Sequence, residues 1–477
     1  MSKWGNPVYT GASKPRHYTV RWDQQNAQMV RLNDAAHITT TTTNFKYSGS
    51  VNPAYNNPFD RIYPWSGRKL CNISLADYMA LQSGDNIKDC VTHWEGEQGF
   101  SYSDPDGVWV YTPDFYGKSW WHGGYRYYDV TDGPFEGYIH YPEQISARWR
   151  GTAETRTIGG AEKQIILSKP GMPIKNTALS TIHTYANNAG LTLDNVFSLD
   201  ASLLLYLVEY ANYNAQGAIG SGVSGLYRQS SDLIKAAATD STVVQVEYSS
   251  AIVGVCIPGA IFDIGTSNGG AQVGSFIIQS AERDSQDSTI LNVTLDRATT
   301  VTSSHYWSIH GLVNLANGEI GSKSGYIGSN GKADAYYRGE ALWGDMFYYV
   351  LGAYKSSSEH VWLTKSAAEA DNYDALNTEN HLDTGIVLAS SSDYIKTLDF
   401  PDSLDVLSAP SLCTAIGGSS SNPVGDYFYT TTGNNRILLV GGGAGGGASD
   451  GPFYWYWYSS AGASNWYISG RPLLKSP

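Results

Sequence analysis

Carboxylates and histidines gather between residues 93 and 143, in a segment that is also rich in aromatic residues. The candidates are His93, Glu95, Glu97, Asp104, Asp106, His122, Glu136, His140 and Glu143. A glycosidase needs two carboxylates that face one sugar across roughly 5–10 Å, with aromatic platforms beside them. The same residue types also occur as turn-forming Asp and solvated Glu in loop-rich β regions. Glycoside hydrolysis is therefore the enzymatic alternative, and the ordinary structural interpretation is favoured over it.

Other catalytic chemistry has no support in the sequence. The GxSxG, HExxH and P-loop patterns do not occur. The cysteines Cys71, Cys90, Cys256 and Cys413 have no CxxC or zinc spacing, so we expect buried free thiols. Asp284-Ser-Gln-Asp287 is too short for a calcium loop. We expect no enzyme activity, no cofactor and no required metal.

Composition narrows the choice of partners. The 477 residues are 42% hydrophobic and 16% charged, which excludes a disordered chain, and they include 35 Tyr, 14 Trp and 51 Gly. A net charge of −13 and the absence of a Lys/Arg-rich run argue against nucleic acid. The N-terminus lacks the apolar core of a signal peptide, and no stretch reaches the ~18 apolar residues of a membrane span. Proteins or sugars are the expected ligands.

The strongest signal lies near the C-terminus. Residues 441–451 read GGGAGGGASDG, and Pro452 then leads into the aromatic run Phe453–Tyr458. In a strand, Trp455 and Trp457 would point to one face and the tyrosines of the run to the other. Trp suits a core, whereas Tyr, Ser and Gly are the residues that antibody paratopes use for contact. We predict a binding face, with a strand buried on both sides as the alternative.

The elements that must position this face are β-rich with two helices. Residues 61–150 have the texture of short strands joined by tight turns. Apolar spacing predicts helices over Lys175–Asn188 and Asp200–Asn214, the second with Asp200 as its N-cap.

The flanking regions differ in texture. Residues 1–60, with the run Thr39–Thr43, are expected to form an extended attachment arm with little core of its own. Residues 241–310 carry β-branched runs that predict a small all-β insert. The aromatic, Gly-rich texture returns at Gly311, so 61–240 and 311–477 are predicted to form one domain interrupted by the insert.

Several motifs carry a family resemblance. They are the glycine run with Gly451-Pro-Phe453, the closing Asn465-Trp-Tyr-Ile-Ser-Gly-Arg-Pro-Leu473, Asn317–Gly331, Ala335–Gly339, Leu342–Asp345, Leu351–Tyr354, Ile62–Trp65 with Cys71-Asn72, and Tyr210–Gln216. Together they resemble the variable proteins of diversity-generating retroelements, including gut phage and prophage members. The match spans about residues 60–477 in pieces and is dense from 311 onward.

This resemblance implies an α+β, β-rich C-type-lectin-like fold of the formylglycine-generating-enzyme subtype. In that family an error-prone reverse transcriptase randomises adenines, so ligand-facing codons vary within a fixed scaffold. The implied variable, ligand-binding positions within 441–471 are Gly443, Gly445, Ser449, Tyr454, Tyr456, Tyr458, Ser459, Ser464, Tyr467 and Ser469. The implied framework is Trp455, Trp457, Trp466, Gly470 and Arg471.

Two departures argue against functions that the fold hosts elsewhere. Formylglycine-generating activity needs a close C-terminal cysteine pair, and only Cys413 lies in that region. The Glu-Pro-Asn and Trp-Asn-Asp triplets of calcium-dependent lectins are absent.

The resemblance implies a phage tail or virion receptor-binding protein that recognises a host-surface protein or glycan. Its arm would bind other virion proteins, and a homotrimer would raise avidity by ~10²–10⁴. The alternatives are a tail-associated glycan hydrolase and a bacterial surface-displayed recognition protein.

Overall fold

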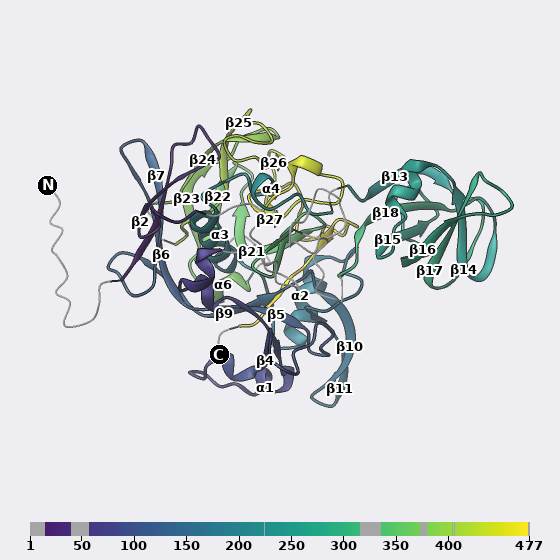
Figure 1. Cartoon of the computed structure of the whole chain (residues 1–477), viewed down its shortest axis with the longest axis horizontal. Coiled ribbons are helices and arrows are strands. Elements are labelled where there is room, and N and C mark those ends of the chain that lie inside the picture. Colours follow the sequence, from purple (N-terminus) through teal and green to yellow (C-terminus); the bar gives the residue numbers. More distant parts are fainter. Residues whose placement is uncertain are drawn as a thin grey trace.

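The computed structural model describes residues 15–39, 57–223, 225–314, 335–372, 379–402, 404 and 406–475. They form a β-rich α+β body, from which a small β-sheet unit projects to one side (Figure 1). The helices are short apart from α2 and α3, as the sequence predicted. Their bounds are α1 Leu75–Ala80, α2 Leu179–Asn188, α3 Val196–Tyr210, α4 Ala215–Ala218, α5 Ser250–Val255 and α6 Ala367–Ala370, with 3-10 turns η1 Pro58–Arg61, η2 Trp65–Gly67, η3 Ile87–Cys90 and η4 Gly447–Ser449.

Helix α3 lies in the centre of the body and is buried on every side except at Phe197. It begins one turn earlier than predicted, because Asn195 and Ser198 form a capping box. The assignment of Asp200 as N-cap is therefore wrong. The Asp200 carboxylate is buried inside the helix and accepts the backbone N–H groups of Ser408 and Ala409. A helix that is apolar on all sides gives no clear start signal in its periodicity.

A five-stranded sheet in the order β2-β1-β7-β6-β8 covers one side of α3. Its strands are β1 His17–Trp22, β2 Val30–Asn33, β6 Phe115–His122, β7 Tyr125–Thr131 and β8 Ile139–Tyr141. Tyr18, Val20 and Trp22 of β1 are buried in the main core. Residues 17–39 of the expected arm thus pack on the body, because β1 pairs with β7 and buries alternate side chains in the body's core. Residues 1–14 and 40–56 of the expected arm lie outside the described residues.

A six-stranded sheet in the order β12-β30-β9-β5-β3-β4 combines strands from the first half of the chain with β30 near its C-terminus. Its strands are β3 Lys69–Ile73, β4 Val91–Trp94, β5 Val108–Thr112, β9 Gln144–Ala147, β12 Thr192–Leu193 and β30 Pro472–Leu473. Two hairpins lie apart from it, β10 Thr152–Ile158 with β11 Ala161–Leu167, and β19 Ala335–Tyr337 with β20 Glu340–Trp343. Because β30 pairs with β9 and β12, segments far apart in sequence share one sheet.

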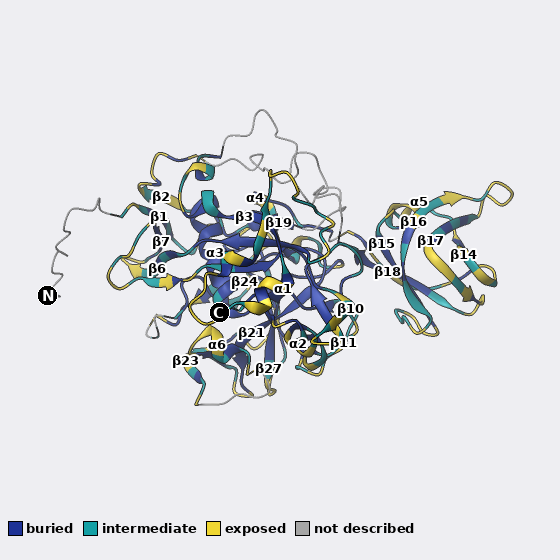
Figure 2. Cartoon of the chain, turned by 90° about the horizontal axis from the view of Figure 1, so that it is seen from below, coloured by how far each residue is buried: buried dark blue, intermediate teal, exposed yellow. Residues whose placement is uncertain are grey.

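The largest sheet carries the C-terminal region and runs β23-β22-β21-β27-β28-β26-β24-β25, with β29 parallel to β21. Its strands are β21 Phe347–Lys355, β22 His360–Thr364, β23 His381–Val387, β24 Asp393–Asp399, β25 Leu412–Ile416, β26 Tyr427–Thr430, β27 Arg436–Val440, β28 Trp455–Trp457 and β29 Ile468–Ser469. Alternate residues of β21, β27 and β28 pack into two different core clusters, one with α3 and one with α2. The middle of this sheet is thus buried on both faces, as the dark interior of the body in Figure 2 illustrates.

The projecting unit is a six-stranded sheet in the order β13-β18-β15-β16-β17-β14, which we call the insert. Its strands are β13 Tyr227–Leu233, β14 Ala238–Glu247, β15 Ala260–Gly265, β16 Gly274–Arg283, β17 Ile290–Val301 and β18 Tyr306–Leu312. It has a hydrophobic cluster of its own, around Phe262 and Trp307. The sheet begins at Tyr227, before the expected 241–310 range. The sequence did not indicate this start because β13 is polar and half exposed and gives no hydrophobic signal.

Candidate ligand-binding face

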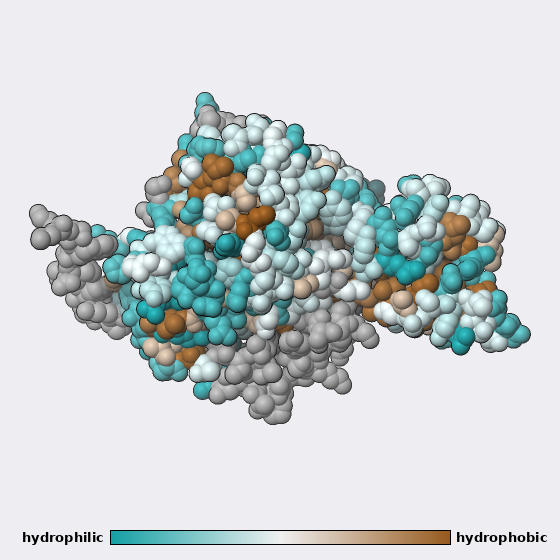
Figure 3. Space-filling model, turned by 90° about the horizontal axis from the view of Figure 1, so that it is seen from above, coloured by the Kyte–Doolittle hydropathy of each residue, from teal (hydrophilic) through white to brown (hydrophobic). Residues whose placement is uncertain are grey.

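Aromatic rings from β21, β26, β28 and the last loop gather on one face of the largest sheet. We call this set the aromatic face: Phe347, Tyr427, Tyr429, Tyr454, Tyr456, Tyr458 and Tyr467. Phe347 is its hub, with ring centroids 5.2 Å from Tyr454, 4.7 Å from Tyr456 and 6.1 Å from Tyr467. The outermost rings are Tyr429 and Tyr458, which are 36% and 48% exposed. Across the body as seen from above, apolar surface occurs only in scattered patches (Figure 3).

The alternation predicted for the aromatic strand is correct for Trp and only partly correct for Tyr. Trp455 and Trp457 are buried in the cluster around α3. Tyr454 and Tyr456 point the opposite way, but each is only 7% exposed. They are covered because the rings of Phe347, Tyr427 and Tyr429 and the loop at 461–467 pack against them on this face of the sheet. The alternative of a strand buried on both faces therefore holds for these residues.

The implied variable positions divide into an open and a covered group. Open or half-buried are Gly445, Ser449, Tyr458, Ser464 and Tyr467, and buried are Gly443, Tyr454, Tyr456, Ser459 and Ser469. The expectation that all of them are displayed is wrong for the second group, whose side chains or backbone are enclosed by neighbouring strands and loops. Contact with a ligand stays a prediction for both groups.

The backbone separates the glycines that could accept a side chain from those that could not. A Cβ on Gly443 would lie 3.6 Å from the Phe347 ring, an ordinary contact, and one on Gly445 would lie 3.2 Å from Tyr227. A Cβ on Gly446 would lie 1.9 Å from the Asp450 carboxylate, and one on Gly442 would lie 2.1 Å from it. Gly441, Gly442 and Gly447 also have positive φ, which disfavours other residues. The two glycines that tolerate a Cβ best are the two that the resemblance assigned as variable.

Two buried carboxyl groups shape the glycine-rich loop. Burial raises the pKa of Asp426 to about 8, and it raises the pKa of Asp450 well above its ordinary value. The backbone N–H of Phe453 donates to Asp426 at 2.7 Å, which holds the start of β28. Asp450 lies against Gly442 and Gly446, and so occupies the interior of the loop. Asp426 is therefore mostly protonated at pH 7, and burial favours the neutral form of Asp450 as well.

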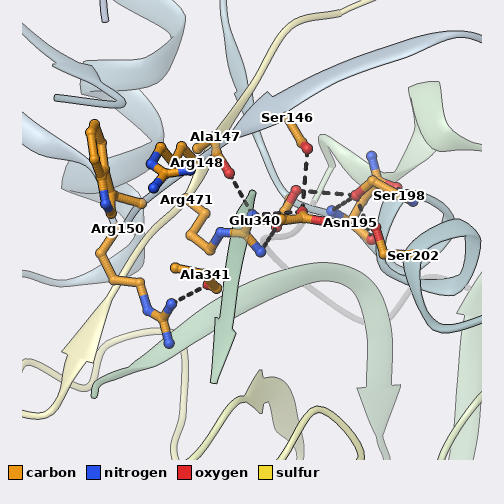
Figure 4. A network of polar contacts seen from close by, with 12 residues as sticks. Ser146, Ala147, Arg148, Arg150, Asn195, Ser198, Ser202, Glu340, Ala341 and Arg471 are labelled. Carbon is orange, nitrogen blue, oxygen red and sulfur yellow. Dashed lines mark hydrogen bonds and ion pairs between the residues drawn. The ribbon is translucent and has the colours of Figure 1, made fainter. Parts of the chain in front are cut away.

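A buried ionic network fixes the end of the chain to the body (Figure 4). Arg471 lies 2.9 Å from Asp194 and 2.6 Å from Glu340, and it donates to the Ala147 carbonyl at 2.6 Å. Glu340 also accepts from Arg68 and from the Ser202 hydroxyl. Burial alone would lower the pKa of Arg471, but the two carboxylates raise it, so the guanidinium stays charged. The framework role expected of Arg471 has this physical basis.

Gly470 and Trp466, two further residues of the implied framework, differ in burial and in what they contact. A Cβ on Gly470 would lie 2.6 Å from Ile182, so this position requires glycine for close packing against α2. Trp466 is only half buried, unlike Trp455 and Trp457. Its ring stacks on His310 of the insert, with centroids 4.0 Å apart, and on Tyr227, with centroids 5.2 Å apart.

The residues between 93 and 143 are engaged in turns and ion pairs. Asp104 accepts the Asp106 N–H, Asp106 accepts the Leu75 N–H, and Glu97 accepts the Trp94 N–H. Glu95 accepts the Tyr102 hydroxyl. The side chains of His93 and Asp104 are part buried, whereas His122 and Glu136 are exposed. These contacts match the ordinary structural interpretation of the segment.

His140 and Glu143 line a cavity of about 320 Å³ that also contains Asp371 and Lys475. Glu143 accepts from Tyr111 and pairs with Lys88. Burial would raise the pKa of Asp371, but hydrogen bonds from His183, Lys475 and Thr192 lower it to about 2. Asp371 lies outside the 93–143 segment; among the candidates of that segment, burial raises the pKa of Asp104.

The cysteines match their prediction, since all four are free and buried. Within the described ranges, no cluster of three or more His, Cys, Asp or Glu has metal-binding geometry. No helix in the part of the chain that the structure describes is long and apolar enough to cross a membrane.

Comparison with known proteins adds no assignment. No protein-family profile matches the chain, and no curated protein matches its sequence significantly.

Sequence reasoning missed the residues that complete the face. Tyr427 and Tyr429 alternate with the buried Phe428, a pattern that the sequence did contain. Phe347 and Tyr227 carried no signal, because only strand pairing and the docking of the insert bring them beside residues 443–467.

Proposed function

We propose that this chain is a non-enzymatic receptor-binding protein of a phage tail or virion. Its C-terminal C-type-lectin-like region would recognise a host-surface ligand through a diversified face. One observation carries the proposal: within the glycine run, a Cβ on Gly443 would make an ordinary contact and one on Gly445 would press only on the Tyr227 ring, whereas on Gly442 and Gly446 it would clash with Asp450. A purely structural glycine turn gives no reason for this difference to coincide with the implied variable positions.

The chemistry of the face supports the same proposal. Burial raises the pKa of Tyr454 and Tyr456, so both stay neutral below the exposed rings of Tyr429 and Tyr458. Tyr458 and Ser464 lie at the exposed margin of the face. Tyr, Ser and Gly offer contact area and adaptable hydrogen bonds at low entropic cost.

The rigid support below the face allows such variation. Trp455 and Trp457 fill the core, and Arg471 ties the segment to Asp194, just before α3, and to Glu340 of β20 through buried charges. Side chains at the open positions can therefore change without loss of the fold.

Two experiments test the function. DNA beside the gene is expected to hold a near-copy of codons 441–471 that differs at adenines, next to a reverse-transcriptase gene. In the phage, Tyr458→Ala should reduce adsorption to host cells roughly 10-fold, as expected for an exposed aromatic anchor. Tyr63→Ala, at an exposed Tyr (37%) outside the aromatic face, is the matched control. Equal adsorption of both variants and the wild type would count against the proposal.

The attachment of residues 1–60 to other virion proteins and the homotrimer belong to the same proposal. Native mass spectrometry of the purified chain tests the trimer.

A further inference from the structure

The insert reaches the aromatic face through a single tyrosine. Tyr227, the first residue of β13, is 38% exposed. Its ring lies 5.2 Å from that of Trp466 at an angle of 23°, and Trp466 in turn contacts Tyr467 at 5.1 Å. The aromatic face thus continues without a break from the body onto the insert.

The same tyrosine borders a position that can vary. A Cβ placed on Gly445 would lie 3.2 Å from Cγ and 3.3 Å from Cδ1 of Tyr227. Gly445 itself is exposed. A larger residue at 445 must therefore either point away from Tyr227 or move its ring.

Buried charges hold the insert in place at this junction. Lys175 of the body lies 2.6 and 2.5 Å from the two oxygens of Asp263, on β15. His310, on β18, contacts the same carboxylate at 2.6 Å and stacks on Trp466. Asp263 and His310 are fully buried, and the Lys175 side chain is 5% exposed. The insert therefore presents Tyr227 in a fixed place.

We infer that the insert is a constant wall of the binding site, with Tyr227 as a ligand-contacting residue whose position is adjusted by residue 445, and that the ligand is a folded protein surface. This inference rests on the proposed function and extends its site beyond residues 441–471.

The arrangement of the rings favours a protein over a glycan. A sugar stacks on an open, flat ring face and is fixed by carboxylate or amide side chains beside it. Here neighbouring rings cover one another, with interplanar angles of 13° for Tyr429 on Tyr456 and 23° for Tyr227 on Trp466. The amide of Asn465 is engaged, since it donates to the Tyr467 hydroxyl. Tyr429 and Tyr458 remain the most exposed rings of the aromatic face, and aromatic rings that carry hydroxyl groups suit the mixed surface of a protein.

The experiment uses the full chain on the surface of yeast, with the open positions Gly445, Ser449, Tyr458, Ser464 and Tyr467 randomised. One arm selects binders to lysozyme, chosen as a defined folded protein, and a parallel arm selects on immobilised dextran. Each lysozyme binder is then remade with Tyr227→Ala. Tyr248→Ala is the matched control, because Tyr248 lies on the insert beside β14, at the opposite end of the strand order.

We expect lysozyme binders to emerge and Tyr227→Ala to raise their Kd roughly 10-fold or more, with a change of less than about 2-fold for Tyr248→Ala. Binders carrying Gly at 445 should depend on Tyr227 most strongly. Binders whose Kd is unaffected by Tyr227→Ala would overturn the inference and leave the proposed function standing. Binders on dextran alone would overturn the assignment to protein ligands, and no binders in either arm would count against the proposed function itself.

Discussion

Replacing Arg471 with Met tests whether the buried network fixes the C-terminal segment to the body. Met retains much of the side-chain volume and removes the charge. Glu340 keeps Arg68 as a partner, but Asp194 loses its cation. Both carboxylates are at most 3% exposed at the side chain, so solvent cannot replace the guanidinium. Removing one partner of a buried pair costs about 3–5 kcal/mol of unfolding free energy.

The cost should depend on pH in a defined direction. Burial raises the pKa of Asp194 to about 6 even with Arg471 present, and the loss of Arg471 raises it further. A carboxyl group whose pKa is raised in the folded state contributes stability that is fully present below its pKa in the unfolded state, near 3.9. That contribution is lost as the pH rises through its pKa in the folded state. The difference between Arg471→Met and wild type should therefore be smaller at pH 5 than at pH 8.

Urea unfolding followed by circular dichroism at both pH values measures this difference. The double variant Arg471→Met with Asp194→Asn should recover part of the loss, because it removes the uncompensated carboxylate. Arg61→Met, at an exposed arginine, is the control and should change stability by less than about 0.5 kcal/mol. A loss below about 1 kcal/mol at both pH values, or a double variant no more stable than the single one, would refute the reasoning.

Three further predictions concern the face and its support. Gly446→Ser should lower the unfolding free energy by about 1–3 kcal/mol, because its Cβ would meet Asp450. Gly443→Ser should lower it by less than about 1 kcal/mol. Similar melting temperatures for the two variants would contradict the distinction between glycines that accept a Cβ and glycines that do not. Trp457→Ala should cost about 3–5 kcal/mol, and its exposed neighbour Tyr458→Ala less than about 1 kcal/mol, as chemical denaturation would show. Burial raises the pKa of Asp426 to about 8, so its contribution to folding stability is fully present below about pH 4 and is lost as pH rises to 8. The melting temperature of Asp426→Asn should therefore rise relative to that of the wild type between about pH 4 and pH 8. A constant difference would argue that Asp426 is ionised in the folded state.

The sequence by itself determined the local features of this protein. Trp455 and Trp457 point to the core because a strand alternates its side chains and indole has a large apolar area. The β-branched runs after residue 241 predicted strands there, but the prediction of an all-β insert is wrong at α5, Ser250–Val255; the unpaired spacing of the cysteines predicted free thiols.

Tertiary structure decided what those features do. Tyr454 and Tyr456 are covered by rings and a loop from other parts of the chain, and the pattern of a single strand does not show what packs on its face. β1 joined the core through pairing with β7, about 110 residues away, which no local window contains. Asn195 caps α3. The sequence did not indicate this start because the helix is buried on nearly all sides, so its periodicity does not mark where it begins.

The extent of the binding face was also a tertiary property. Phe347 reaches it through the parallel pairing of β21 with β29, and Tyr227 through the docking of the insert on Lys175. About half of the implied variable positions in the segment 441–471 are therefore enclosed. The rings that complete its surface come from β26 close by and from Phe347 and Tyr227 far earlier in the chain, which strand pairing and the docking of the insert bring there.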